Sequence, residues 1–155
     1  MLVEQISIFL ENKSGRLAEV AKVLGDQKIN IRALTIADTT DFGVLRLIVD
    51  QPAQAEKILS AREFTVRTTK VIAVEIPDQP SGLVATLGAL EEAHVDIEYM
   101  YAYASKPGEK AIVIIKIADC ERAIDALTNK NIRILTAQEV YESQPNQPCA
   151  QSDND

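Results

Sequence analysis

The hydrophobic residues of this chain change their spacing in a fixed order. Over residues 6–10 apolar side chains alternate with more polar ones, which is typical of a half-buried β-strand. Over residues 17–24 they recur at i, i+3, i+4 and i+7, so a helix is predicted to start after Gly15 and to end near Asp26. Two β-rich runs, a second helix and a last strand follow. These are residues 29–38 and 42–49, a helix after Asp50 with Pro52 in its first turn, and residues 64–76.

The same order repeats in the second half of the chain. Residues 12–31 (NKSGRLAEVAKVLGDQKINI) match residues 78–97 (DQPSGLVATLGALEEAHVDI) at an offset of 66. The elements predicted for the second copy are residues 71–76, 81–93, 95–104, 110–117, 120–129 and 132–142. We therefore predict two domains, 1–70 and 71–142, and a polar, disordered tail over 143–155.

The order of elements predicts the fold class. A β-α-β-β-α-β unit with right-handed crossovers forms an antiparallel ferredoxin-like sheet in the spatial order 4-1-3-2, so the chain is α+β with two such units. No linker separates them, because the run RTTKVIAVEIP has to end one unit and begin the next. We expect the units to pack side by side as one joined, eight-stranded antiparallel sheet with the helices on one face. We also expect the helices of the two units to be buried against each other.

Composition and charge limit the kinds of molecule that the chain is expected to bind. Of 155 residues, 46% are hydrophobic and 25% are charged, and the whole net charge of −7 arises after residue 75. An acidic chain without a basic run is repelled by phosphate backbones and anionic lipid, so we expect no nucleic acid and no membrane as partner. The chain has no apolar run that could span a membrane and no leader-like start, so we predict a cytoplasmic protein. Cys120 and Cys149 are predicted to be unpaired thiols.

The sequence lacks the usual signatures of catalysis. His94 is the one histidine, and no CxxC, HExxH, GxGxxG or GxSxG motif occurs. We therefore predict no catalytic residue, no metal site and no cofactor, and we interpret His94 as a surface or capping residue. RNA-binding modules share the ferredoxin-like order, but they need paired aromatic residues on a basic sheet, and the strands here carry mainly Ile, Val and Leu.

The turn between the first strand and the first helix occurs twice, as ENKSGRL and PDQPSGL. Small residues there let the backbone approach a ligand, and the free N–H groups of the following helix suit a carboxylate. An amide or carboxylate at the start of the turn could hold an ammonium group, so the turn predicts a free amino acid as ligand. The alternative is that these residues only form turns and caps. The candidate ligand-binding residues are Asn12, Ser14, Gly15, Arg16 and Leu17 in the first turn, and Asp78, Pro80, Ser81, Gly82 and Leu83 in the second.

At these residues the sequence resembles the ACT domain family, the small ligand-binding modules of amino-acid metabolism. The marker is an Asn or Asp before a turn with Gly and Leu, and a second Asn or Asp before Ile 18 residues later. Asn12 with Asn30 and Asp78 with Asp96 both show this spacing, and the resemblance covers residues 1–142. In serine-sensing members of the family both residues contact the effector, so the resemblance implies that role for these four.

Two further patterns bear on the ligand. The serine-sensing members carry a His two residues before the first Asn, whereas this chain has Leu10 and Ile76, so the identity of the amino acid stays open. Tyr99, Tyr101 and Tyr103 alternate along one predicted strand. They could line a pocket for a larger side chain, or they could simply pack at the sheet edge.

Strand geometry predicts how the four Asx residues combine. Strands one and two of a unit run parallel, so Asn12 and Asn30 lie at opposite ends of one sheet, roughly 17 Å apart. A shared ligand must then be held across units, by Asn12 with Asp96 and by Asp78 with Asn30. We therefore expect two pseudo-symmetric sites at the domain interface, near facing first helices.

These patterns favour a tandem ACT protein that binds a free amino acid and regulates a metabolic enzyme in trans, with no catalysis of its own and with a homodimer as one option. One alternative is an assembly or protein-docking module that binds no small molecule. A third alternative is an enzyme of unknown type that depends on Tyr101 or His94, but no sequence motif supports it.

Overall fold

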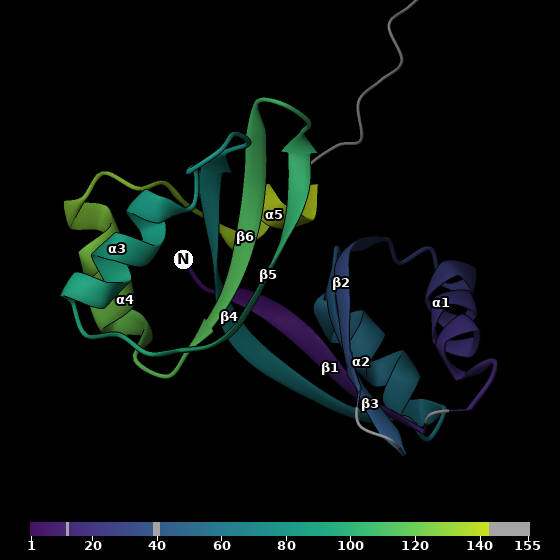
Figure 1. Ribbon diagram of the computed structural model, residues 1–155. Coiled ribbons are helices and arrows are strands. Elements are labelled where there is room, and N and C mark those ends of the chain that lie inside the picture. Colours follow the sequence, from purple (N-terminus) through teal and green to yellow (C-terminus); the bar gives the residue numbers. More distant parts are fainter. Residues whose placement is uncertain (12, 39–40, 143–155) are drawn as a thin grey trace, which may run out of the picture.

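The computed structural model describes residues 1–11, 13–38 and 41–142. Up to Asn129 its strands and helices follow the predicted order (Figure 1). In chain order they are β1 (Val3–Glu11), α1 (Arg16–Asp26), β2 (Ile31–Asp38), β3 (Phe42–Val49), α2 (Pro52–Ala61), β4 (Thr65–Pro77), α3 (Val84–Glu92), β5 (Ile97–Lys106), β6 (Lys110–Ile117), α4 (Cys120–Asn129), β7 (Ile134–Leu135) and α5 (Ala137–Glu142).

One antiparallel sheet in the order β2-β3-β1-β4-β6-β5 contains both units, and β7 pairs with β4 beside this path. Residues 65–71 of β4 pair with β1, and residues 72–77 pair with β6, while residues 73–74 also pair with β7. Each unit therefore has the ferredoxin-like order, and β4 is the last strand of one unit and the first of the next. The prediction of eight strands is wrong for the described residues, because it counted this shared strand twice; there are seven.

Side chains along β4 alternate between the two faces of the sheet. Val66 packs on the core beneath α1 and α2, and the Thr68 hydroxyl donates a hydrogen bond to Glu56 of α2 at 2.9 Å. Ile72 and Val74 belong to the core beneath α3 and α4. The even-numbered residues of β4 thus face α1 to α4, so these four helices lie on one face of the sheet, as the sequence predicts.

The two units meet on the opposite face, which α1 to α4 leave uncovered. The odd-numbered residues Val71 and Ala73 of β4 belong to a third core, which contains strand residues from both units. Its fully buried or nearly buried members are Val3, Ala33, Ile48, Val71, Ala73, Ile112, Ile114, Leu135 and Val140. The sheet is therefore coiled until this face closes on itself. The predicted burial of the two helix pairs against each other is wrong, because the pairs lie toward opposite ends of the molecule (Figure 1).

Four helices end in one repeated motif. The last turn of α1 to α4 is followed by a residue in the left-handed conformation, and the next N–H donates to a leucine carbonyl five residues back, as in a Schellman motif. The left-handed residues are Lys28, Glu63, His94 and Asn131, and the N–H donors are Ile29, Phe64, Val95 and Ile132. Each of these N–H groups belongs to an apolar residue whose side chain turns back toward the core. The four helices therefore end in the same way in both halves of the chain.

The end of the described chain departs from the prediction. Residues 132–142 were expected to form a strand, but only Ile134–Leu135 pair with β4, and α5 follows. The Thr136 hydroxyl accepts from the Glu139 N–H at 3.2 Å, and the Glu139 carboxylate accepts from the Thr136 N–H at 2.8 Å. This capping box starts a helix where a strand was predicted. Val140 belongs to the core between the units, so α5 packs on the face opposite α1 to α4.

Candidate functional site

The first strand-to-helix turn is an open, basic concavity. Gly15 has φ 88°, a left-handed conformation that glycine adopts without strain, and α1 begins at the next residue. A cavity of about 290 Å³ lies beside this turn. Its lining residues are Leu10, Glu11, Lys13, Arg16, Leu17, Ile36 and Gly43. Ser14 and Gly15 are exposed, Arg16 and Leu17 line the cavity, and Asn12 lies outside the described residues.

Two cations stand at this turn. Lys13 bonds Glu11 at 2.7 Å and thereby lowers the pKa of that carboxyl, while Arg16 bonds Glu19 through Nη1 at 2.8 Å. The Arg16 guanidinium also stacks 4.6 Å from the ring centre of Phe64, and its buried Nε has no hydrogen-bond acceptor among the described residues. Among those residues no side chain caps the start of α1. Lys13, Arg16 and the N–H groups at the start of the helix can therefore donate hydrogen bonds to a carboxylate.

The second turn uses the same kinds of residue to bind its own backbone. The Asp78 carboxylate accepts from the Gly108 N–H at 2.8 Å, and the Asp78 N–H donates to the Glu109 carbonyl at 3.0 Å. A Cβ atom on Gly82 would overlap the carbonyl oxygen of Pro77. Glycine is thus required here because the turn folds onto itself.

Other predicted residues of this turn also serve its conformation. Ser81 takes the left-handed conformation that Gly15 has in the first copy, with φ 66°, and Pro80 has no N–H to donate. Leu83 packs against the core beneath α3 and α4. A neighbouring cavity of about 160 Å³ contains none of the predicted ligand-binding residues. The two turns are therefore not equivalent, and the first is the more accessible one.

The second pair of predicted residues lies elsewhere. The Asn30 N–H donates to the Asp50 carboxylate at 2.9 Å, at the start of β2. Asp96 precedes β5 and lines a cavity of about 620 Å³ with Leu87 and His94. None of these three cavities, in the part of the chain that is described, combines residues of both units. The expected facing of the first helices is wrong, because α1 packs on α2 and α3 on α4.

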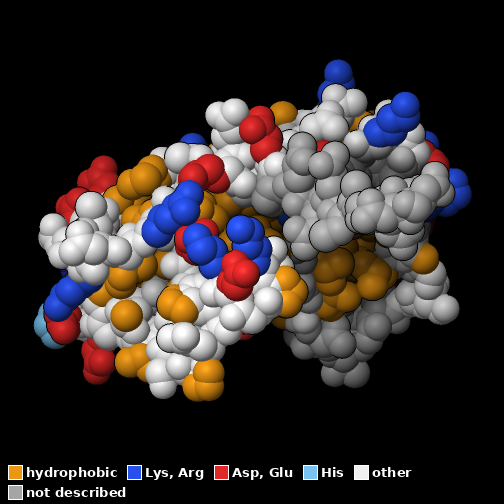
Figure 2. Space-filling view, turned by 90° about the horizontal axis from the view of Figure 1, so that it is seen from above, with side chains coloured by type: hydrophobic (Ala, Val, Ile, Leu, Met, Phe, Trp, Pro, Cys, Tyr) orange, Lys and Arg blue, Asp and Glu red, His pale blue; other side chains and the backbone are white. Residues whose placement is uncertain are grey.

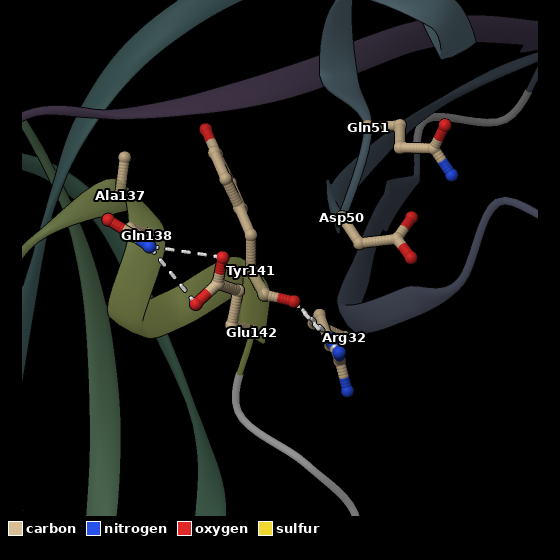
Figure 3. Close-up of a pocket in the computed structure, with 7 residues that line it drawn as sticks. All are labelled: Arg32, Asp50, Gln51, Ala137, Gln138, Tyr141 and Glu142. Carbon is tan, nitrogen blue, oxygen red and sulfur yellow. Dashed lines mark hydrogen bonds between the residues drawn. The ribbon is translucent and has the colours of Figure 1, made fainter.

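One cavity does lie between the units. It has a volume of about 700 Å³ and separates α5 from the start of β2 and of α2 (Figure 3). Arg32 reaches across and donates to the Tyr141 carbonyl through Nε at 3.0 Å and Nη2 at 2.8 Å. The Tyr141 hydroxyl in turn accepts from the Glu4 N–H at 2.9 Å, where β1 extends beyond β3. These contacts bind α5 of the second unit to β1 and β2 of the first.

Metal-binding groups and membrane-spanning helices do not occur among the described residues. They contain no group of three or more His, Cys, Asp or Glu side chains that could hold a metal ion. None of the described helices is long and apolar enough to cross a bilayer.

Comparison with known proteins identifies the architecture. A family model described as an ACT domain pair matches residues 1–143. The chain belongs to the ACT domain family. Protein BT0572 from Bacteroides thetaiotaomicron is 42% identical, with a TM-score of 0.87 over 92% of this chain and 97% of that chain. No curated protein matches the sequence.

More distant ACT proteins share the fold. The regulatory subunit of aspartate kinase from Thermus thermophilus is 17% identical, with a TM-score of 0.60 over 82% of this chain and 91% of that chain. The corresponding subunit from Thermus flavus is 17% identical, with a TM-score of 0.58 over 84% and 94%. An ACT domain pair is a regulatory module rather than a catalytic one.

Between the two ACT domains lies a polar network that sequence reasoning missed. Gln5 is fully buried, and its Nε2 donates to the Tyr99 hydroxyl at 2.7 Å and to Ser7 Oγ at 3.3 Å. The Tyr101 hydroxyl donates to Gln5 Oε1 at 2.8 Å. Burial, followed by the neighbouring Tyr99, raises the pKa of Tyr101 far above its ordinary value. Gln5 lies on the same side of β1 as Ser7, which is the more polar side of the alternating run over residues 6–10, and that side faces the other domain.

The tyrosine stripe is therefore packing at the interface of the ACT pair. Tyr101 and Tyr103 pack against the shared core, and burial raises the pKa of Tyr103. The Arg46 guanidinium of β3 stacks 3.8 Å from the ring centre of Tyr99. Aromatic residues from the second domain thus cover polar and charged residues of the first, and of the two interpretations of the stripe the structure shows packing.

His94 occupies the left-handed position after α3, with φ 52°, and its N–H donates to the Glu91 carbonyl at 2.9 Å. We expect His94→Gly to raise the free energy of unfolding by about 0.5–1 kcal/mol, because glycine takes this conformation without a Cβ penalty. Chemical denaturation measures the change. His94→Ala should give no gain, since alanine keeps the Cβ; a gain of similar size from alanine would contradict this explanation.

Proposed function

We propose that this ACT domain pair is an amino-acid-binding regulatory protein whose ligand carboxylate is held at the first strand-to-helix turn. The observation that carries the proposal is the cavity of about 290 Å³ at that turn, with Lys13 and Arg16 at a helix start that no side chain of the described residues caps. The membership of the ACT family supports the class of ligand.

The chemistry of the turn suits a carboxylate. Arg16 is held by the Phe64 ring and by Glu19, so its guanidinium is already oriented before a ligand arrives. A charge-assisted hydrogen bond from Lys13 or from the Arg16 guanidinium to a carboxylate contributes roughly 1.5–3 kcal/mol. Leu17 and Ile36 offer apolar surface beside these donors. A small amino acid therefore meets both a polar and an apolar wall.

Of the remaining predicted residues we propose Asn12, Ser14 and Gly15 as further contacts at this turn. The Asp78 turn is a weaker candidate, since its carboxylate and its glycine already serve the chain's own backbone. We accordingly propose one ligand for each chain.

The regulatory role follows from mass action. A ligand that binds only the folded, closed pair stabilises it by about 2.7 kcal/mol at a hundredfold excess over its Kd. That free energy can shift the equilibrium of an enzyme that contacts the pair in trans. Relatives of the same fold that are described as regulatory subunits of aspartate kinase support an enzyme partner in amino-acid metabolism.

The test is a thermal-shift and calorimetric screen of the full chain against the twenty amino acids. We expect at least one to raise the melting temperature, and we expect Arg16→Gln or Lys13→Gln to weaken its binding about tenfold to a hundredfold. Lys22→Gln is the matched control, because Lys22 lies on the same helix and forms its ion pair with the exposed Asp26, and this variant should bind as the native chain does.

The opposite result has a clear meaning. If none of the twenty changes the melting temperature or gives heat, the ligand-binding proposal is wrong. The pair would then be an assembly or docking module, which is the second candidate.

A further inference from the structure

The cavity of about 700 Å³ between the two domains shares no lining residue with the cavity at the first turn. We call it the interdomain cavity. Asp50 and Gln51 of the first domain form one wall, and Gln138 and Glu142 of α5 form the opposite wall, with Tyr141 between them (Figure 3). Small-molecule sites occupy roughly 300–1,000 Å³. The interdomain cavity is therefore large enough for a ligand that contacts both domains.

Both walls of the interdomain cavity carry hydrogen-bond acceptors. The Asp50 carboxylate accepts from the Asn30 N–H at 2.9 Å through Oδ1, while its other oxygen and Gln51 Oε1 have no hydrogen-bond donor among the described residues. On the opposite wall, the two oxygens of Glu142 accept from the Gln138 amide at 3.1 and 3.2 Å. A ligand that fits both walls therefore has to bring N–H donors.

The charges around the cavity favour a positive ligand. Asp50 and Glu142 contribute negative charges from opposite walls. Arg32 contributes a positive charge, but its Nε and Nη2 donate to the Tyr141 carbonyl, at the negative end of the α5 dipole. The wider field has the same sign, because the whole net charge of −7 arises after residue 75. Figure 2 shows acidic side chains at the end of the molecule that carries α3 and α4.

The lining suits an organic cation better than a metal ion. The described residues contain no group of three or more His, Cys, Asp or Glu side chains that could hold a metal ion. Between the two acidic walls lie the Tyr141 ring and the Ala137 methyl group, on which methylene groups can pack. The ring is fixed in place, because its hydroxyl accepts from the Glu4 N–H at 2.9 Å. The matching ligand has a positive group at each end and an aliphatic middle.

We infer that the interdomain cavity binds a small aliphatic diamine, with one ammonium group on Asp50, the other on Glu142, and the methylene chain over Tyr141. This ligand differs in class and place from the amino acid proposed at the first turn. One end contacts the first domain and the other contacts α5, so the diamine strengthens the contact that Arg32 already makes with Tyr141. Its binding is thereby linked to the closed arrangement of the two domains.

Isothermal titration calorimetry of the full chain with 1,4-diaminobutane at constant ionic strength tests the inference. We expect one diamine to bind each chain. Butylamine has the same carbon chain with a single ammonium group and should bind about tenfold more weakly or worse, and tetramethylammonium, which has no N–H donor, should not bind. Butylamine that binds as tightly as the diamine, or a diamine that gives neither heat nor a change in the NMR spectrum, overturns the inference.

Two conservative variants test the two ends of the ligand. Asp50→Asn and Glu142→Gln each remove one charge but keep an oxygen for the existing hydrogen bond, so the fold should persist, which circular dichroism checks. Each should weaken diamine binding about tenfold to a hundredfold. Asp125→Asn removes the same charge from an exposed position of α4 and is the matched control. Losses of equal size in all three variants would mean that the diamine responds only to net charge, which overturns the inference.

NMR spectroscopy locates the bound diamine. The side-chain amide signals of Gln51 and Gln138 should shift on saturation, whereas that of Gln54, exposed on α2 outside the cavity, should stay in place. Shifts confined to other residues overturn the inference. The result is independent of the proposed function, because the two cavities share no residue. Glu142→Gln should therefore bind an amino acid found by the screen as the native chain does, and failure of that screen leaves the diamine site standing.

Discussion

Replacing Gln5 with leucine is expected to lower the free energy of unfolding by about 2–4 kcal/mol. Leucine fills a similar volume, but it leaves the partly buried Tyr101 hydroxyl without its acceptor and the Tyr99 hydroxyl without its donor. Each unsatisfied buried polar group costs roughly 1–3 kcal/mol. Urea denaturation followed by circular dichroism measures the loss.

A double-mutant cycle tests the cause of this loss. Adding Tyr101→Phe to Gln5→Leu removes the donor together with its acceptor, so the double variant should be more stable than the sum of the single losses implies. A coupling free energy near zero, or a single variant within about 0.5 kcal/mol of the native chain, would show that the network does not stabilise the contact between the domains.

Replacing Gly82 with alanine is expected to lower the free energy of unfolding by about 2–4 kcal/mol, because the new Cβ would overlap the Pro77 carbonyl oxygen. The obstacle is backbone, which cannot rotate away as a flexible side chain can. The turn has to open, so the Asp78 bond to Gly108 is lost as well. Thermal denaturation and the amide exchange rate of Gly108 measure the two effects.

Gly88→Ala is the matched control for this substitution. Gly88 lies within α3, and a Cβ there meets no atom within 4 Å. Alanine should therefore stabilise the helix by roughly 0.5–1 kcal/mol. Equal losses at both positions would indicate that any change to this helix region is destabilising and that the overlap with Pro77 is not the reason.

The order of elements could be predicted because it depends on local periodicity. Alternation over residues 6–10 and helical spacing over residues 17–24 are determined by which side of each element is buried, and the repeat at an offset of 66 confirms the order in the second half. The run RTTKVIAVEIP correctly indicated a strand shared by both units. Its double role also caused the error in the strand count.

The arrangement of the two units could not be predicted in the same way. Which face of a sheet closes on itself depends on its coiling over many residues, which no short pattern records. Gln5 is a polar position of an alternating strand. Its burial depends on Tyr99 and Tyr101 of the second domain, which no pattern around Gln5 reveals. A signal for α5 was available, since Thr136 and Glu139 have the spacing of a capping box.

For the site, the sequence located the two turns but could not tell what their residues contact. A glycine in such a turn allows a close approach of either a ligand or the chain itself. At Gly82 the approaching group is Pro77 of the same turn, whereas at Gly15 a Cβ would meet nothing within 4 Å and only the positive φ requires glycine. The same residue type therefore has two different physical reasons in the two copies.

The shared strand β4 also limits how such a protein can be rearranged by recombination. Residues 65–71 pair with the first unit and residues 72–77 with the second, so a crossover in or beside β4 gives one of the two units a foreign strand segment. A chimera that exchanges one half with a relative has to accept a foreign strand through the middle of both cores. The pair is therefore expected to be duplicated, transferred and inherited as a single genetic unit.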